Sequence, residues 1–482
     1  MAIPAHDVVI DTRPLRVILL ERAGRPIALA VAAALYWLIS RRPLPDGLSP
    51  EGLQGLAVFA PCLVLWISGA LPLMVTSLLA FVLIPWAGVL PTHEAYALFG
   101  NEAVFFILGV FILAAALMRS KLSTRLALVI LRRFGHTPRT LLLSLFLLNA
   151  VMSFFMSEHA VAAMNFPIVM EIIRVLGLKR DHSNYARALL LAMAWGTTIG
   201  GVATLLGGAR APLALGIVRQ ATGQSFTFTE WAVATLPVVV VMLAIAYVVI
   251  TRFFPIDIER IDAADELIAE RTLALGRTSV REKAIGAVML ATLAGWILGG
   301  EQLGLASVAL TGVVVLFALG LVVWSDVEGY VSWGILLMYG GAIALGTALA
   351  QSGAAQWLSQ QTIARWAETG PGAVGIIAAL SIVLTEGMSN SAVVAMMMPV
   401  TLGVAQDFAI EPRVMALVVA VPEGLAFALP IGTPANAIAY SSGYLRVRDM
   451  IVPGGILACS AWLTVNVVAR FYWPLLGISI GG

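Results

Sequence analysis

The sequence contains little charge and little cysteine. Charged residues make up 12% of the 482 residues, and the two cysteines, Cys62 and Cys459, both lie in apolar runs. Two distant thiols exclude a disulfide framework, and we expect both to be buried and inert. The formal net charge of +2 provides no strongly basic surface, and no His-Glu-x-x-His or similar metal motif occurs. We therefore expect no nucleic-acid partner and no resident cofactor.

Apolar residues, in contrast, are abundant. They make up 60% of the chain, and the mean hydropathy is +0.94. A hydrocarbon core of ~30 Å needs ~20 apolar residues per spanning helix, and many continuous runs of this kind are present. The pattern predicts an all-α polytopic membrane protein with about 11 transmembrane helices, surrounded by membrane lipid. We expect it in the cell membrane, specifically the bacterial inner membrane.

One eleven-residue stretch occurs twice. Ser157–Pro167 and Ser389–Pro399 share six identical positions at an offset of 232. The same offset relates Ser153 to Thr385, which are hydroxyl residues four positions before each motif serine. Two halves with polar interruptions inside apolar segments are typical of secondary transporters. A second pair of matching stretches, at an offset of 225, comprises residues 205–211 and 430–436.

Each repeated stretch lies between two apolar runs that are too short to span comfortably, at 140–178 and 371–406. Such a pair predicts a re-entrant helical hairpin with the motif at its tip, where non-helical backbone is tolerated if it lines a cavity. Lys and Arg flank the first hairpin densely, whereas Arg365 and Arg413 are the flanking bases of the second. Because cytoplasmic segments are rich in Lys and Arg, the hairpins enter from opposite sides, as in an inverted-topology repeat. The N-terminus is then cytoplasmic and the C-terminus outside.

A helix that breaks at mid-membrane exposes unpaired backbone groups. Half-helix N-termini offer N–H groups and the positive dipole end to an anion, and free carbonyls can coordinate a small cation. The hydroxyls and amide of Ser389, Asn390 and Ser391 suit either ligand without adding charge. Gly432 and Pro434 suit a turn close to a ligand, because glycine has no side chain and proline has no N–H. The pattern predicts a carrier of a small anion.

These residues resemble the divalent anion/sodium symporter family, which includes dicarboxylate, citrate and sulfate transporters. Its mark is a Ser-Asn-Thr triplet at two hairpin tips, each followed by a broken helix with a Gly-Thr-Pro-Pro-Asn-like turn. Thr385–Ser391 and Gly432–Ile438 resemble the second copies of both, and the resemblance covers residues 50–474. It implies an elevator-type mechanism, a homodimer, one site for a small dianion between the tips and two sodium sites beside it.

The resemblance also assigns roles to single residues. The second sodium site would comprise Thr385, Ser389, Asn390 and Gly432, and the first would comprise Ser153, Ser157 and Gly207. Substrate would meet Asn390, Ser391, Thr433, Pro434 and Asn436 in the second half, and Ser157, Glu158, His159, Gly208 and Arg210 in the first.

Charges and apolar runs divide the chain into parts, and the resemblance assigns these parts to a scaffold and a transport domain. Residues 119–139 are a basic amphipathic helix at the membrane surface or a basic loop, and both interpretations put them inside. The predicted parts are a cytoplasmic tail with the first transmembrane helix (1–49), the first repeat (50–254), a cytoplasmic loop (255–283) and the second repeat (284–482). In the first repeat, scaffold helices lie at 50–139, and the hairpin and broken helix of the transport domain lie at 140–254. In the second repeat, scaffold helices lie at 284–368, and the hairpin and broken helix of the transport domain lie at 369–474.

The first half departs from the family pattern. Glu158 and His159 stand where the triplet has Asn and Thr, and Arg210 lies in the first turn. Charged residues at membrane depth are costly, so they indicate function. A bare Glu158 would repel a dianion by about 4 kcal/mol at ~4 Å in an effective dielectric of 20, and it should therefore be protonated, ion-paired or turned away.

Three interpretations follow. Glu158 pairs with Arg210, the pair replaces the first sodium ion, and His159 donates to substrate. Alternatively, Glu158 or His159 exchanges protons and couples transport to H⁺. In the third, Glu158 is a carboxylate ligand of sodium. One intact sodium site, proton coupling and cation-independent anion exchange are all compatible with the sequence, and so are C4-dicarboxylates, tricarboxylates, sulfate and sulfonates as substrates.

Other classes of function fit less well. A pore would favour a line of polar or like-charged residues along several helices. An intramembrane enzyme is disfavoured, because adjacent residues at a tip point apart and cannot align as nucleophile, base and orienting group. Near the second tip, we expect Glu386 and Glu423 to accept hydrogen bonds from the backbone.

Overall fold

The computed structural model describes residues 15–180 and 182–481, so the part of the predicted tail at 1–14 lies outside the described residues. Within these ranges every regular element is a helix, which confirms the predicted all-α class. Eight helices are long and apolar enough to cross a membrane, and four further apolar helices have 10–17 residues. α1 (Leu15–Ser40) contains the predicted first span.

The helices of the first half follow the predicted order. A hairpin and a broken helix come after the spans, and one more long helix closes the half. The elements are α2 (Pro50–Ser68), α3 (Leu73–Trp86), α4 (Thr92–Ala97), η1 (Leu98–Gly100), α5 (Glu102–Arg119), α6 (Leu122–Phe134), the hairpin α7 (Pro138–Ser153) and α8 (Glu158–Val175), the broken helix α9 (Asn184–Gly200) and α10 (Arg210–Thr222), and α11 (Phe228–Phe253).

The second half repeats this order, in agreement with a duplicated architecture. It is preceded by α12 (Asp262–Ala274) and comprises α13 (Val280–Leu303), α14 (Leu305–Ala318), α15 (Trp324–Val327), η2 (Glu328–Tyr330), α16 (Trp333–Gln351), α17 (Ala354–Gln361), η3 (Ile363–Arg365), the hairpin α18 (Gly370–Gly387) and α19 (Asn390–Asp407), the broken helix α20 (Val414–Glu423) and α21 (Pro434–Ser441), α22 (Val447–Phe471) and η4 (Trp473–Leu476).

Two expectations were wrong in detail. The segment 255–283 is not all loop, because it contains α12, which packs against α6 and α8. Asp262 and Asp265 in its first turn and Arg271 in its last turn complement the helix dipole and favour a helix here. Of the two thiols, Cys62 is buried as expected, but Cys459 is exposed, since it lies on the outer surface of α22.

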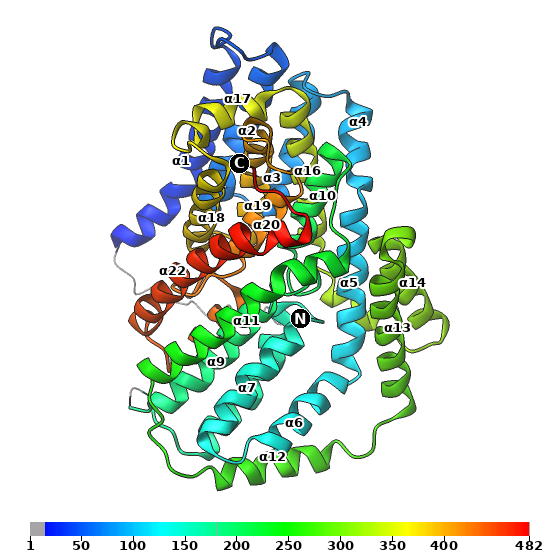
Figure 1. The fold of residues 1–482 in the computed structure, drawn as a ribbon, viewed down its shortest axis with the longest axis vertical. Helices are drawn as coiled ribbons and strands as arrows, with labels where there is room; N and C mark the ends of the chain where they lie inside the picture. The colour runs from blue at the N-terminus through cyan, green and yellow to red at the C-terminus, as the bar shows by residue number, and fades with distance from the viewer. Residues whose placement is uncertain (1–14, 181, 482) are drawn as a thin grey trace, which may run out of the picture.

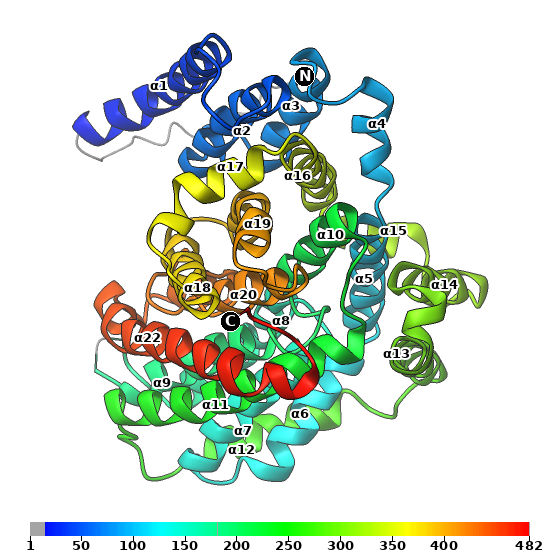
Figure 2. The same ribbon diagram turned by 45° about the horizontal axis from the view of Figure 1, so that its top comes forward.

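Helices of the two halves pack against one another. α7, α9, α11 and α22 lie side by side on one flank, and α13 and α14 lie beside α5 on another (Figures 1 and 2). α10 packs against α5, α16, α19 and α20. The broken helix of the first half therefore contacts elements of both halves.

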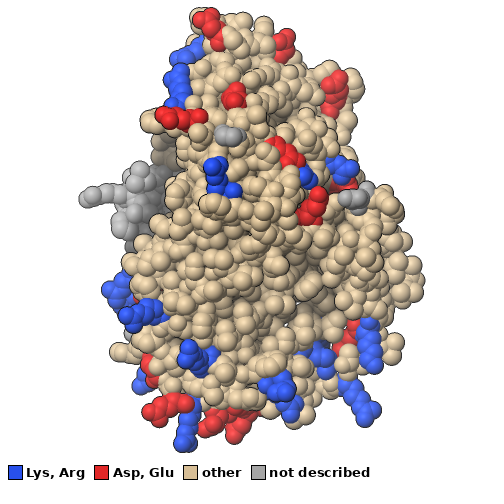
Figure 3. Space-filling view, in the orientation of Figure 1, with Lys and Arg blue, Asp and Glu red and all other residues tan. Residues whose placement is uncertain are grey.

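Charged side chains are concentrated toward the two ends of the long axis, and a largely uncharged band lies between them (Figure 3). One of these ends carries α6 and α12, and we call it the basic end (Figure 1). There Arg125 of α6 donates to Glu282 Oε2 at 3.1 Å and to the Leu275 and Gly276 carbonyls at 3.0 and 2.7 Å. The uncharged band agrees with a belt facing lipid.

Local sequence explains where the hairpin helices begin. Thr137 forms a capping box before Pro138 in α7, and Thr369 caps α18, which has proline in its first turn. At the first tip, Ser157 caps α8 by accepting from Ala160 N at 3.4 Å. At the second tip, Ser389 precedes α19 but makes no side-chain cap.

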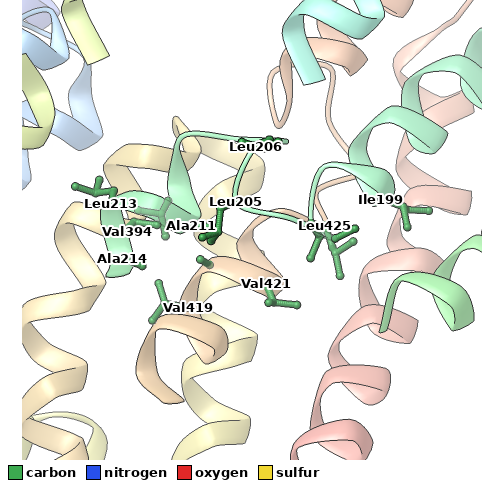
Figure 4. Packing of buried hydrophobic residues seen from close by; sticks show 14 of the residues in the cluster. Ile199, Leu205, Leu206, Ala211, Leu213, Ala214, Val394, Val419, Val421 and Leu425 are labelled. Carbon is green, nitrogen blue, oxygen red and sulfur yellow. The ribbon is translucent and has the colours of Figure 1, made fainter. Parts of the chain in front are cut away.

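The two breaks are held by close backbone packing and by apolar side chains. A Cβ built on Gly207 would lie 2.6 Å from the Gly201 carbonyl carbon, so the first break folds back onto the end of α9 as only glycine permits. Figure 4 shows side chains of the first break, α10, α19 and α20 in one buried cluster, with Leu205, Leu206, Val394, Val421 and Leu425 among them. This packing fixes the breaks relative to each other.

Candidate functional site

A cavity of about 870 Å³ lies where the hairpin tips and the breaks meet. Its wall includes nine of the ten residues predicted to contact substrate: Ser157, Glu158, His159, Gly208, Arg210, Asn390, Ser391, Thr433 and Pro434. The tenth, Asn436, has no exposed surface and lies behind the second break, where its amide donates to the Ala426 and Leu429 carbonyls at 3.2 and 3.3 Å. Asn436 therefore stabilises the turn of the second break and does not line the cavity.

Part of the cavity wall comes from residues that no motif marked. They belong to the second half of α5 and to the segment around η2, and they are Phe111, Ala114, Met118, Gly329, Tyr330, Val331, Ser332 and Ile335. Met118 precedes Arg119, which pairs with Asp326 at 2.8 Å near the start of α6. The cavity therefore extends from the tips toward the basic end.

The first tip carries a buried ion pair. Glu158 is the first residue of α8, Arg210 is the first residue of α10, and they are 4% and 3% exposed. Arg210 Nη1 donates to Glu158 Oε1. In addition, Glu158 N donates to the Gly207 carbonyl at 2.9 Å. The charged pair and the backbone bond together join the tip to the break.

Three polar atoms around this pair have no hydrogen-bond partner: Ser153 Oγ, Glu158 Oε2 and Arg210 Nη2. A Cβ built on Gly201 would lie 3.2 Å from Ser153 Oγ and 3.3 Å from Glu158 Cδ, so Gly201 keeps the hydroxyl and the carboxylate close. Buried oxygens without partners suit a cation or a water molecule. The guanidinium, however, already neutralises this carboxylate.

His159 follows the pair and is exposed to the cavity. Its neighbours Ser157 and Glu158 are turned inward, toward the cap of α8 and toward Arg210. The imidazole is therefore the group of the first tip that is free to reach a molecule in the cavity.

The second tip is neutral. Asn390 Nδ2 donates to the Glu423 carbonyl at 3.4 Å, and the Thr385 hydroxyl behind it is buried without a partner. Since Ser389 makes no side-chain cap, the N–H groups at the start of α19 remain available for a ligand. Thr433 caps α21 and lies 3.3 Å from the Thr198 hydroxyl of α9. At the second tip, oxygen atoms that could bind a cation thus lie close to N–H groups that could bind an anion.

Glu386 supports the second break, as expected. Its carboxylate accepts from the backbone N–H groups of Phe427 and Ala428 through Oε1, at 2.8 and 2.9 Å, and of Leu429 through Oε2, at 2.8 Å. For Glu423 the same expectation is wrong, because neither of its carboxylate oxygens accepts a hydrogen bond. The two acids near the second tip therefore differ in role.

We predict that Glu386→Gln lowers stability by about 1–3 kcal/mol, because a neutral amide accepts these N–H groups more weakly and turns an N–H₂ toward one of them. Thermal unfolding of the purified protein measures the change. Glu368→Gln is the control, since Glu368 is exposed just before the same hairpin. Equal unfolding temperatures for the two variants would contradict the prediction.

Comparison with known proteins gives a consistent result. Residues 24–479 match the family described as the sodium:sulfate symporter transmembrane region. The sodium-dependent dicarboxylate transporter SdcS of Staphylococcus saprophyticus is 30% identical over 95% of this chain and 93% of its own length. Its counterpart in Staphylococcus aureus is 27% identical with the same coverage.

A solved structure has a similar fold. The crystal structure of the YdaH transporter of Alcanivorax borkumensis superposes with a TM-score of 0.56 and covers 96% of this chain and 99% of that one, at 15% sequence identity. Together with the family match, this similarity identifies a multi-pass membrane transporter and not an enzyme. The chain belongs to the sodium:sulfate symporter family, the divalent anion/sodium symporters predicted from the hairpin-tip motif.

Proposed function

We propose that the chain is a sodium-dependent transporter of C4-dicarboxylate-like dianions, in which the Glu158–Arg210 ion pair replaces the first sodium ion. The names of the relatives support sodium and dicarboxylates. The observation that carries the altered site is the buried salt bridge between Arg210 Nη1 and Glu158 Oε1. A guanidinium held at this place supplies permanently the positive charge that a bound ion would otherwise bring.

The second half would then bind the remaining sodium ion. Thr385 Oγ1 has no partner, and Ser389, Asn390 and Gly432 surround the same turn without any basic side chain. One substrate carboxylate would meet the N–H groups at the starts of α19 and α21, where the dipole favours an anion. His159 would donate to the other end of the substrate.

We further propose an elevator motion in a homodimer. Residues 140–254 and 369–474 would carry the site past a fixed scaffold at 50–139 and 284–368. If the basic end is cytoplasmic, the N-terminus is inside, the C-terminus is outside, and the cavity opens inward. On the opposite side of the site, α10 meets α5 through Arg219–Glu102 and through Asn101 Nδ2, which donates to Gln220 Oε1 at 3.2 Å.

These contacts predict that Arg219→Gln favours the outward-facing state. The pair is partly exposed and such pairs contribute about 0.2–1 kcal/mol, so the equilibrium should shift by about fivefold at most. The probe is Ala163→Cys, at the cavity wall, in a background without Cys62 and Cys459. An impermeant thiol reagent applied from outside should label this cysteine up to about fivefold faster when Arg219→Gln is present than when it is absent. Glu230→Gln is the control, because the Glu230–Arg413 pair (3.3 Å) joins α11 to the start of α20 within the moving part. Faster labelling in both variants, or in neither, contradicts the assignment.

The test of the whole proposal is uptake of labelled succinate into proteoliposomes, with and without internal dicarboxylate, under a sodium gradient, a proton gradient or neither. We expect sodium to drive uptake with a Hill coefficient of about 1, because one binding site remains. Strong sodium cooperativity would contradict the replacement of the first ion, and uptake driven by protons would contradict sodium coupling. Uptake that needs only internal dicarboxylate would identify an anion exchanger, the second candidate, which the permanent guanidinium also favours.

A further inference from the structure

We propose that Glu423 is a positioning residue for Arg210: its carboxylate, from the second repeat, holds the guanidinium together with Glu158 from the first. The inference rests on the proposed function, since it explains how a built-in cation is kept at a sodium position. The three charged groups come from α8, α10 and α20.

Glu423 is the last residue of α20 and has no exposed surface. Its backbone carbonyl accepts from Asn390, but both carboxylate oxygens lack a hydrogen-bond partner. A buried carboxylate without hydrogen bonds is strongly unfavourable unless a positive charge lies near it. Glu423 therefore needs a cation within reach in order to act as an anion.

Arg210 provides it. Its guanidinium lies against the residue that follows Glu423, since a Cβ built on Gly424 would be 2.7 Å from Arg210 Cζ and 2.6 Å from Nη2. Nη1 pairs with Glu158, whereas Nη2 is buried without a partner. One side of the guanidinium thus meets Glu158, and the other meets the C-terminal end of α20, where the helix dipole favours a cation.

The other groups that face the cluster leave Arg210 as the cation shared by the two acids. Tyr339 of α16 is buried, and its hydroxyl donates to the carbonyl of Ala209, the residue before Arg210. Glu386 of α18 is occupied by backbone N–H groups. Arg210 accordingly pairs with Glu158 of the first repeat and lies against the C-terminal end of α20 in the second, where Glu423 is the buried acid without a partner.

The test is a thermal-unfolding cycle on the full-length protein. Arg210→Met leaves both carboxylates without their cation and should lower the unfolding temperature. Adding Glu423→Gln to Arg210→Met should raise the unfolding temperature again. In the parent protein, Glu423→Gln should lower the unfolding temperature or leave it unchanged, because the guanidinium still has Glu158. Glu282→Gln is the control, since Glu282 is a similarly shielded acid that pairs with Arg125 away from the site. Glu282→Gln should shift the unfolding temperature equally with and without Arg210→Met. If Arg210→Met does not fold, Gly424→Ala takes its place, because the added methyl group displaces the guanidinium.

Transport adds a readout that a packing role would not change. Removing a negative charge beside Arg210 should lower the KM for succinate several-fold in Glu423→Gln, and Glu423→Asp should keep a value closer to that of the parent protein. Equal temperature shifts for Glu423→Gln in both backgrounds would overturn the proposal, and so would an unchanged KM. The unfolding cycle needs no transport, so it can succeed even where the proposed sodium stoichiometry fails.

Discussion

Arg210→Ala is expected to reduce dicarboxylate uptake by about 100-fold or more and to destabilise the protein by about 3–5 kcal/mol. Removing one member of a buried ion pair leaves the other charge uncompensated, and the cost is of this size. Here Glu158 is 4% exposed and its second oxygen already lacks a partner, so no alternative donor takes over. The tip and the break would lose the bond that joins them, and a loss of about 3 kcal/mol in binding free energy corresponds to about 100-fold in affinity.

Uptake in proteoliposomes and thermal unfolding in detergent measure the two effects. Arg132→Ala is the control, because Arg132 is an exposed base of α6 that does not line the cavity. The double variant Glu158→Gln/Arg210→Met should recover the part of the stability that the unpaired Glu158 costs, but neither the part that Glu423 costs nor the uptake. Normal uptake by Arg210→Ala with unchanged stability would remove Arg210 from the site.

Much of this site is predictable from local sequence. Motifs at a fixed offset locate both tips, and glycine and proline locate both breaks, because the chain must bend there whatever surrounds it. The Glu158–Arg210 pair is predictable for the same reason, as the repeat places each residue beside a tip and a break that must meet. Glu386 is similarly predictable, because an acid beside an unwound segment finds free N–H groups.

Other parts of the site depend on tertiary packing that no local pattern encodes. Tyr330 and Ser332 line the cavity because the segment around η2 passes the tips, and Gly424 contacts Arg210 because α20 crosses the end of α10. Glu423 has the same signal as Glu386, since both acids lie at the end of a helix near a break, but the free N–H groups of residues 427–429 meet Glu386 and not Glu423. Only the fold distinguishes the two acids.

The largest gain of function is expected from Glu158→Asn/Arg210→Ala. This double substitution copies the second half, where Asn390 and Ala435 occupy the equivalent positions at offsets of 232 and 225. It removes both charges of the salt bridge together, so Glu158 is not left buried alone, and Glu423 is the one acid that loses its cation. Ser153 Oγ, already without a partner, and the new amide oxygen would then face the space that the guanidinium occupied. Oxygen ligands without a fixed cation suit sodium.

We therefore expect the double variant to transport succinate with a steeper sodium dependence, with a Hill coefficient that rises from about 1 toward 2 as a second ion binds. Arg210→Ala alone should not do so, because Glu158 would remain and oppose the dianion. Uptake is measured against sodium concentration, and dual-label flux gives the sodium-to-succinate ratio. Together they show whether a second sodium ion binds. An active double variant with an unchanged Hill coefficient would mean that the ion pair does not stand at a sodium position. A rise would mean that the Glu158–Arg210 ion pair occupies the place of a second sodium ion.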